Sequence, residues 1–195
     1  MTRGPGQRAG LTREAVLAAG REVLAERGLT GLSMRALAGR LGVAPNALYS
    51  HVADKIALVD DLLDDLLGDL DPPAPDDDPI AGLRGVMLAT HDLLVRHPGL
   101  VPAYLARQGA RGPHARALGD AMAVLLARLG VTGDPAARVI RALIVHTLGF
   151  TALATADDPA LPPDTLRADL AVTLDWLLRG AADGGASDAA SGARR

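Results

Sequence analysis

The chain has 195 residues, of which 49% are hydrophobic and only four are aromatic, and it contains no cysteine. This composition excludes a disordered polymer, disulfide bonds and thiolate metal sites, and the abundance of Ala and Leu favours helix over strand. The net charge of -3 conceals an asymmetry, because residues 1–55 carry a net of +4 and the remainder a net of -7. A basic front on an acidic body predicts that only the N-terminal part meets a polyanion.

Neither a membrane span nor a signal peptide is expected. No uninterrupted apolar run approaches the roughly 20 residues that span a bilayer, and the opening MTRGPGQRAGLTREA has no apolar core of the kind that signal peptides carry. The sequence therefore predicts a cytoplasmic protein with no membrane partner. Its fold class is expected to be all-α, with about nine helices.

The N-terminal region is expected to begin with an arm and three helices. Residues 1–10 are rich in Gly, Pro and Arg and are predicted to be disordered. Thr12 is a suitable N-cap for the first helix of a domain over residues 11–55, and Gly28 is a suitable stop for that helix. A fourth helix follows, and residues 56–70 are predicted to form a connecting helix that packs against the parts on both sides of it. Its carboxylate pairs, Asp60-Asp61 and Asp64-Asp65, are interpreted as a solvated face.

The stretch from Ser33 to His51, SMRALAGRLGVAPNALYSH, has the pattern of two helices joined by a tight turn. Ser33 caps the first helix, Gly42 ends it, and Pro45 opens a short second helix, since proline there loses no hydrogen bond. Such a corner can place its second helix in a major groove, although any plain corner between helices has the same spacing. The outward side chains of the second helix include no acid, which favours contact with DNA.

The segment from Leu11 to Leu67 resembles the DNA-binding domain of tetracycline-repressor-like (TetR) regulators along its whole length. The matching stretches are LTREAVLAAGREVLAERGLTGLSMRALAGRLGV and ALYSHVADKIALVDDLL. The resemblance implies that Ser33 and Arg35 face a phosphate or a base, and that Tyr49, His51 and Lys55 hold backbone phosphates. It implies a recognition surface made of Pro45, Asn46, Ala47, Tyr49, Ser50 and His51. Operator DNA, a small-molecule effector and a second copy of the chain are the partners that it implies.

The remainder of the chain is predicted to be a helical domain for ligand binding and dimerisation over residues 71–180. The run DPPAPDDDP, from Asp71 to Pro79, is a connection that cannot be helix or strand. Proline at the starts and glycine at the ends mark the helices that follow. They are expected at about residues 80–97, 100–106, 113–129, 135–156 and 163–179. Residues 181–195 are expected to form a disordered tail.

The expected helix over residues 135–156 has two apolar stripes, and a helix that is apolar on two sides must be buried on two sides. One stripe holds Val139, Leu143, His146, Phe150 and Leu153, and the other holds Ile140, Ile144, Leu148 and Ala152. This pattern favours a homodimer in which one side meets the partner and the other meets a pocket. Packing of both sides inside one monomer is the alternative.

Polar or aromatic side chains among apolar ones are the candidates for a ligand pocket, although each also suits ordinary packing. They are His91, Tyr104, Gln108, His146, Thr147 and Phe150. No metal site, cofactor or catalytic motif is predicted, so the chain is not expected to be an enzyme. The favoured function is a repressor released from a palindromic operator by a small, mostly apolar effector. The alternatives are an activator, a helical carrier of hydrophobic ligands with a vestigial helix-turn-helix, and a helical enzyme.

Overall fold

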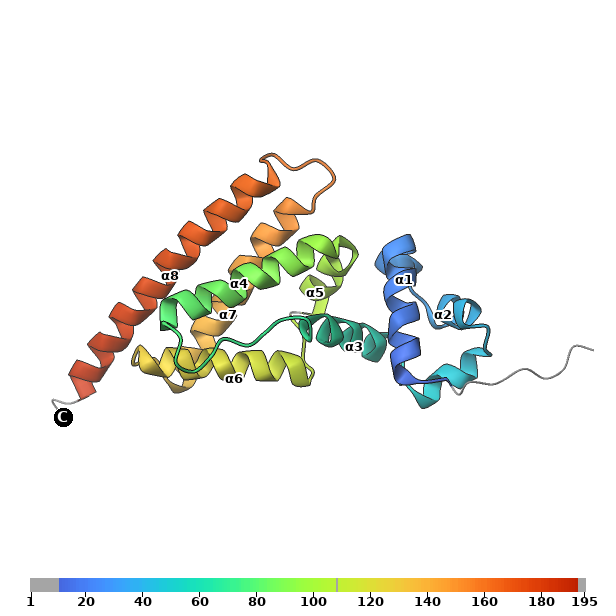
Figure 1. Ribbon diagram of the computed structural model, residues 1–195, viewed down its shortest axis with the longest axis horizontal. Helices are drawn as coiled ribbons and strands as arrows, with labels where there is room; N and C mark the ends of the chain where they lie inside the picture. The colour runs from blue at the N-terminus through green and yellow to red at the C-terminus, as the bar shows by residue number, and fades with distance from the viewer. Residues whose placement is uncertain (1–10, 108, 193–195) are drawn as a thin grey trace, which may run out of the picture. The chain divides into compact units, whose positions relative to one another are not determined.

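The computed structural model describes residues 11–107 and 109–192, and all regular structure within them is helical (Figure 1). The short 3-10 helix η2 continues directly into α5, so the helical segments match the nine that the sequence predicts, and the all-α class is confirmed. In chain order the elements are α1 (Arg13–Gly31), α2 (Met34–Leu41), η1 (Pro45–Ser50), α3 (Lys55–Leu67), α4 (Pro79–Arg96), η2 (Pro98–Leu100), α5 (Val101–Arg107), α6 (Pro113–Arg128), α7 (Gly133–Ala154) and α8 (Pro163–Gly192).

The chain divides into two compact units, Met1–Leu62 and Leu63–Arg195, and the division falls inside α3. It therefore lies within the segment, residues 56–70, for which the sequence predicts a connecting helix. The first part of α3 packs in the N-terminal unit, and its last turn packs in the C-terminal unit. The arm expected over residues 1–10 lies outside the described residues.

The N-terminal unit is built from α1, α2, η1 and the first half of α3. The Thr12 hydroxyl accepts a hydrogen bond from the Ala15 amide at 3.2 Å and so caps α1, as the sequence predicts. Gly28 breaks the helical geometry with φ of 64°, but helix resumes for one more turn to Gly31. Every element contributes apolar side chains to a single core, among them Val16, Val23, Leu37, Leu48, Leu58 and Leu62.

In the C-terminal unit α4 packs against α6, α7 and α8, and α7 and α8 also pack against each other. The inner faces of these helices are lined by leucine, as the 3.6-residue spacing of apolar positions requires. Fully buried examples are Leu83, Leu94, Leu125, Leu143, Leu170 and Leu174.

The prediction of a disordered tail over residues 181–195 was wrong for residues 181–192, because α8 continues past Gly180 to Gly192. A packing contact accounts for the extra turns. A Cβ at Gly185 would lie 2.7 Å from a methyl of Val131 and 3.0 Å from the Leu129 carbonyl oxygen. The absence of a side chain at Gly185 thus lets α8 rest on the turn between α6 and α7, a long-range contact that no local stop signal reveals.

Helix α7 satisfies the length and composition expected of a membrane span, contrary to the expectation that no segment would. Its 22 residues include a stretch with mean hydropathy of 1.4, and only 28% of that stretch is buried. The sequence shows no uninterrupted apolar run here, because Arg138 and Arg141 interrupt the stretch without lowering its mean hydropathy far. An apolar helix with so much exposed surface calls for a partner.

Candidate nucleic-acid interface and ligand cavity

The corner between α2 and η1 is shaped by three local signals. The Ser33 hydroxyl accepts a hydrogen bond from the Ala36 amide at 3.1 Å and caps α2. Gly42 ends α2 in the left-handed conformation, with φ of 66°, which costs glycine little. Pro45 begins η1, and the fully buried Leu48 anchors that short helix to the core.

Around Leu48, the remaining side chains of η1 face outward. Pro45, Asn46, Ala47, Tyr49 and Ser50 are exposed, Tyr49 by 52%, and His51 is half-buried. The Ser50 hydroxyl donates to the Ala47 carbonyl at 2.9 Å. A helix held by one apolar side chain and surrounded by small or hydrogen-bonding groups presents a surface that can contact base edges and phosphates.

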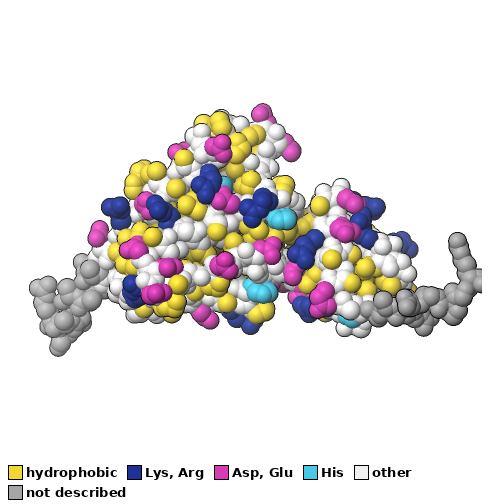
Figure 2. All heavy atoms as spheres, in the orientation of Figure 1, with side chains coloured by type: hydrophobic (Ala, Val, Ile, Leu, Met, Phe, Trp, Pro, Cys, Tyr) yellow, Lys and Arg dark blue, Asp and Glu magenta, His cyan; other side chains and the backbone are white. Residues whose placement is uncertain are grey.

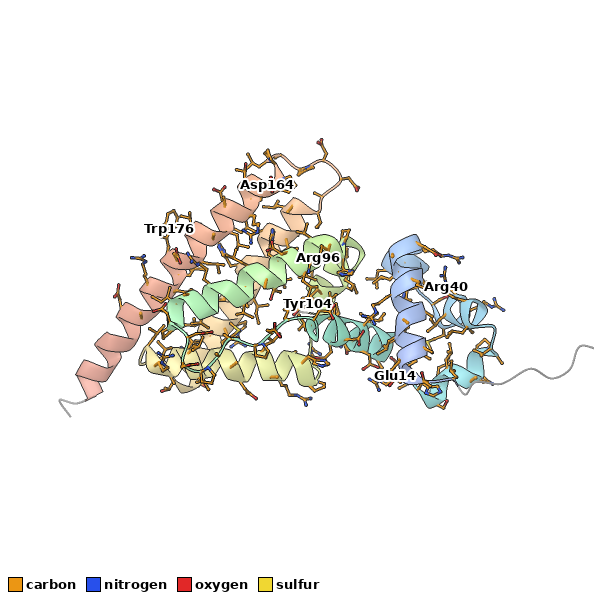
Figure 3. The ribbon with its side chains drawn as sticks, in the orientation of Figure 1. Glu14, Arg40, Arg96, Tyr104, Asp164 and Trp176 are labelled. Carbon is orange, nitrogen blue, oxygen red and sulfur yellow. The ribbon has the colours of Figure 1, made fainter. Side chains whose placement is uncertain are left out.

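Arg40 fastens α2 to α1 (Figure 3). Its Nη1 donates to Glu22 at 2.6 Å and its Nη2 donates to Glu26. These hydrogen bonds, that to Glu22 foremost, raise the pKa of the guanidinium above its ordinary value, so Arg40 stays charged. The two helices are therefore held in register by a bridge of opposite charges, which the sequence reading did not identify.

Lys55 has an intramolecular role that the sequence alone did not predict. Its Nζ donates to the Leu29 carbonyl at 3.0 Å, close to the break in α1 at Gly28. The side chain thus satisfies a carbonyl at the end of α1 and links α1 to α3. The Ser33 hydroxyl oxygen likewise has an intramolecular partner, because it caps α2, whereas Arg35 is exposed in the first turn of that helix. Contact of these three residues with DNA stays a prediction.

The basic character of the N-terminal unit is modest once residues 1–10 are considered apart from residues 11–55. Two of the eight basic residues before position 56, Arg3 and Arg8, lie outside the described residues. Figure 2 shows Lys and Arg side chains interspersed with Asp and Glu over the N-terminal unit on the face that it presents. The electrostatic attraction to a polyanion expected from residues 11–55 is therefore weaker than the total of +4 suggests.

The C-terminal unit contains a cavity of about 120 Å³ walled mainly by α4, α6 and α7, with contributions from α5 and the last turn of α3. Its wall is largely apolar and includes Leu67, Val86, Met122 and Ile144. The hydroxyl-bearing side chains on it are those of Thr90, Tyr104 and Thr147. Among the described residues that line the cavity, none is Asp, Glu, Lys, Arg or His.

Two of the six predicted pocket residues, Tyr104 and Thr147, lie on the cavity wall. His91 is buried beside it but does not line it, and Gln108 lies outside the described residues. The helical period reveals two apolar faces of α7 without showing which face meets the cavity. The structure places the stripe of Ile140, Ile144 and Leu148 there, and not the stripe that holds His146 and Phe150.

His146 and Phe150 lie together on another side of α7, toward α8. Their rings are 5.0 Å apart between centroids and meet edge to face. The His146 Nε2 lies 2.6 Å from the Thr173 hydroxyl oxygen. Since that hydroxyl donates to the Asp169 carbonyl, Nε2–H is the donor to Thr173. Both rings are half-buried, and partial burial lowers the pKa of His146.

A chain of hydrogen bonds runs through the buried side chains behind the cavity wall. The Thr151 hydroxyl donates to the Thr147 carbonyl at 2.8 Å, so the 3.0 Å contact with His91 is a hydrogen bond donated by Nδ1–H. Burial lowers the pKa of His91, which keeps the imidazole neutral at pH 7. The Thr147 hydroxyl itself is buried and has no hydrogen-bond partner among the described residues.

Asp64 corrects the interpretation of the α3 carboxylates as a solvated face, because it is buried. It caps α6 by accepting hydrogen bonds from the Ala115 amide at 2.9 Å, the His114 amide at 3.3 Å and the His114 Nδ1 at 3.1 Å. A Cβ at Gly112 would lie 2.1 Å from the Asp64 carboxyl carbon, so only glycine fits there. The last turn of α3 is therefore tied to the first turn of a helix that lines the cavity.

Comparison with known proteins connects this geometry to regulators. The family model described as bacterial regulatory proteins of the tetR family matches residues 16–62. The class C tetracycline repressor protein of Escherichia coli is 33% identical over 149 residues, which cover 71% of this chain. The alignment spans 64% of that repressor, somewhat less than two thirds of its length.

Solved structures extend the likeness over both units. BioQ of Mycobacterium smegmatis is 26% identical, with a TM-score of 0.77 over 89% of this chain and 99% of BioQ. BioQ has also been solved with its natural double-stranded DNA operator. A TetR variant of Acinetobacter baumannii in complex with minocycline is 26% identical, with a TM-score of 0.76 over 88% of this chain and 96% of that one. The solved structures that resemble this chain thus include one with operator DNA and one with a small molecule.

Proposed function

The chain belongs to the TetR family of bacterial regulatory proteins, and from that premise we propose that it is a homodimeric, ligand-responsive regulator of transcription. The observation that carries the proposal is the helix η1, which is anchored by the buried Leu48 and surrounded by exposed polar and small side chains. BioQ, which resembles this chain over both units, is known with its operator bound. We assign Pro45, Asn46, Ala47, Tyr49, Ser50 and His51 to base and phosphate contacts, with Arg35 on a neighbouring phosphate.

Dimerisation is proposed through α7 and α8, which leave large apolar side chains in solvent. Val145 and Leu153 are 64% and 57% exposed on one face of α7, and Trp176 is 67% exposed on α8. Figure 3 shows Trp176 pointing away from the rest of the unit, and Figure 2 shows further hydrophobic side chains on that flank. Gly149 lies between the two α7 residues, and a Cβ there would meet no other atom within 4 Å. Packing against the same helices of a second copy would bury this face.

Effector sensing is proposed for the cavity, through the last turn of α3. Leu67 lines the cavity, and Asp64, one turn earlier, caps α6. A bound molecule that displaces Leu67 or α6 would shift α3, whose first half belongs to the DNA-binding unit. The effector then favours a separation of the two recognition helices that no longer fits successive major grooves, provided that it binds the two states with different affinity.

The finer role proposed is that of a repressor in the cytoplasm, released from a palindromic operator by its effector. The class C tetracycline repressor, the relative that aligns over most of this chain, supports repression over activation. No catalytic role is proposed. A carrier of hydrophobic ligands would share the cavity but would need no exposed η1 surface, so DNA binding discriminates between them.

The test is selection of bound duplexes from a random pool with the full-length chain at low salt. The proposal predicts enrichment of an inverted repeat with half-sites about one helical turn apart, bound by two copies of the chain. An Asn46→Ala, Tyr49→Ala double variant serves as the control, because both side chains are exposed and its fold should be unchanged. Absence of any enriched sequence from the wild type would overturn the regulator and favour the carrier.

A further inference from the structure

We propose that the effector of this protein is an uncharged molecule about the size of one aromatic ring, bound through a hydrogen bond to the Thr147 hydroxyl. That this molecule acts as an effector rests on the proposed function, but the chemistry of the ligand follows from the cavity alone. Three properties of the cavity carry it: its volume, the absence of charge on its described wall, and one hydroxyl left without a partner.

The volume limits the ligand to a small molecule. The cavity measures about 120 Å³. A dry cavity of roughly 150 Å³ lined by apolar side chains holds benzene, so this slightly smaller cavity limits the ligand to about a single ring. Larger polycyclic molecules would have to displace the wall or extend out of the cavity. Because α6 is held at its N-terminus by Asp64, such displacement would disrupt a buried carboxylate cap.

The wall rejects ions. Its described residues are aliphatic, small or hydroxyl-bearing, and none carries a side-chain charge at neutral pH. The nearest titratable group in the hydrogen-bond chain behind the wall is His91, whose Nδ1–H is already donated to Thr151. A carboxylate or ammonium ion entering the cavity would lose hydration without meeting a counter-charge on the described wall, at a cost of several kcal/mol. Acids, phosphates and amines are therefore disfavoured against neutral molecules of the same shape.

Thr147 supplies a directional contact. Its side chain is 1% exposed, its Oγ1 lacks a partner among the described residues, and the residue lies on the cavity wall. Each of the other hydroxyl oxygens there has a partner: Thr90 donates to the Val86 carbonyl at 2.7 Å, and the Tyr104 oxygen accepts from the Ala110 backbone. Buried polar groups in folded proteins are almost always paired, so an unpaired hydroxyl on a residue of the cavity wall points to a ligand that enters the cavity and pairs with it.

The experiment is calorimetric titration of the full-length chain with three molecules of similar shape: p-cresol, toluene and benzoate. We expect p-cresol to bind roughly 3- to 10-fold more tightly than toluene, which lacks the hydroxyl. Benzoate should give no saturation at concentrations where p-cresol saturates. Equal binding of benzoate and p-cresol, or no binding of p-cresol, would overturn the proposal.

Three variants locate the contact. Thr147→Val keeps the shape and should abolish the preference for p-cresol over toluene. Thr155→Val should retain it, because Thr155 is not among the residues of the cavity wall and its hydroxyl donates to the Thr151 carbonyl at 2.9 Å. Gly119 lines the cavity, and a Cβ there would meet no atom within 4 Å. Gly119→Leu should therefore fill the space and remove binding of both molecules without unfolding α6. Unchanged p-cresol binding in Gly119→Leu, or an undiminished preference in Thr147→Val, would contradict the assignment.

These measurements need no DNA, so their outcome is independent of the regulator proposal. If the chain selects no DNA sequence but binds the three molecules in the predicted order, the ligand class is supported and the protein is a carrier. Selection of an operator by a chain that does not discriminate p-cresol from benzoate would overturn the ligand class and leave the regulator standing.

Discussion

The two units of this molecule use their buried leucines for different purposes. In the N-terminal unit, Leu48 is buried so that its neighbours on η1 can be exposed, and the core holds a surface in place. In the C-terminal unit, Leu67 and Leu148 enclose a cavity, and the core itself is the candidate binding site. Substitution of a core residue should therefore abolish function through unfolding in the first unit and alter ligand binding directly in the second.

The largest effect is expected at Leu48. Leu48→Ala removes a fully buried side chain and should cost about 2–5 kcal/mol of stability in the N-terminal unit. The neighbouring Tyr49→Ala changes an exposed side chain and should alter stability by no more than about 0.5 kcal/mol. Chemical denaturation of both variants measures this contrast, and DNA binding should be weakened in both. Similar stability of the two variants would show that η1 is not anchored as described.

The next effect is expected at the carboxylate cap in the C-terminal unit. Asp64→Ala removes the acceptor of three hydrogen bonds at the start of α6 and should cost about 1–3 kcal/mol of stability. Asp69→Ala is the matched control, because Asp69 is exposed just beyond α3. Denaturation midpoints provide the measurement. If both variants unfold at the same midpoint as the wild type, the cap does not hold α6.

A smaller pair of effects with opposite signs is expected at two threonines one turn apart on α7. Thr147→Val replaces an unpaired buried hydroxyl and should stabilise the unliganded protein by about 1 kcal/mol. Thr151→Val removes the donor to the Thr147 carbonyl and the acceptor for His91, and should destabilise it by about 1–2 kcal/mol. Thermal unfolding without ligand distinguishes them, and a shift of the same sign in both would contradict the hydrogen-bond chain.

The smallest effect is the response of stability to pH. Burial lowers the pKa of His91 in the folded state, while Asp92 raises it in part and Arg167 lowers it further. Above the unfolded pKa of about 6.5 both states are neutral at this residue. Below it the unfolded state takes up more protons, so the contribution of His91 to stability is lost as pH falls from about 6.5 toward the folded pKa.

The midpoint of thermal unfolding between pH 7.5 and 5 measures this contribution. The wild type should lose more stability on acidification than His91→Gln, which has no titrating group at this position. Burial also lowers the pKa of His146. Its effect on stability has the same sign in both proteins, so this effect cancels when the two are compared. A steeper loss in the variant would mean that His91 is stabilised in its charged form.

The sequence predicted best where the signal is local. Ser33, Gly42 and Pro45 each act within one turn of helix, so the helix-turn-helix could be predicted nearly residue by residue. Gly180 is an equally good local stop, yet α8 continues because Gly185 packs on a turn more than fifty residues earlier. Asp64 has the same local pattern as the neighbouring carboxylates of α3, and only its contact with the distant α6 explains its burial.

The candidate cavity shows the same difference between local signals, which were predictable, and long-range packing, which was not. Its apolar character was predictable from the stripes on α7, and Tyr104 and Thr147 were identified among its candidates. Which stripe faces inward was not predictable, because both have the same period and only the packing of α4 and α6 selects one. Lys55 lies at a position where the resemblance implies phosphate contact, yet its hydrogen bond to Leu29 depends on how α1 and α3 meet.

The account depends most on the claim that exposed residues of η1 bind DNA, and one measurement tests it directly. Anisotropy titration of the selected duplex at fixed salt should compare the wild type with Asn46→Ala and with Asp69→Ala, an exposed change in the other unit. The account predicts that Asn46→Ala binds about 5- to 150-fold more weakly, with an unchanged unfolding transition, and that Asp69→Ala binds as the wild type does. Equal affinity of all three proteins for the selected duplex would contradict it.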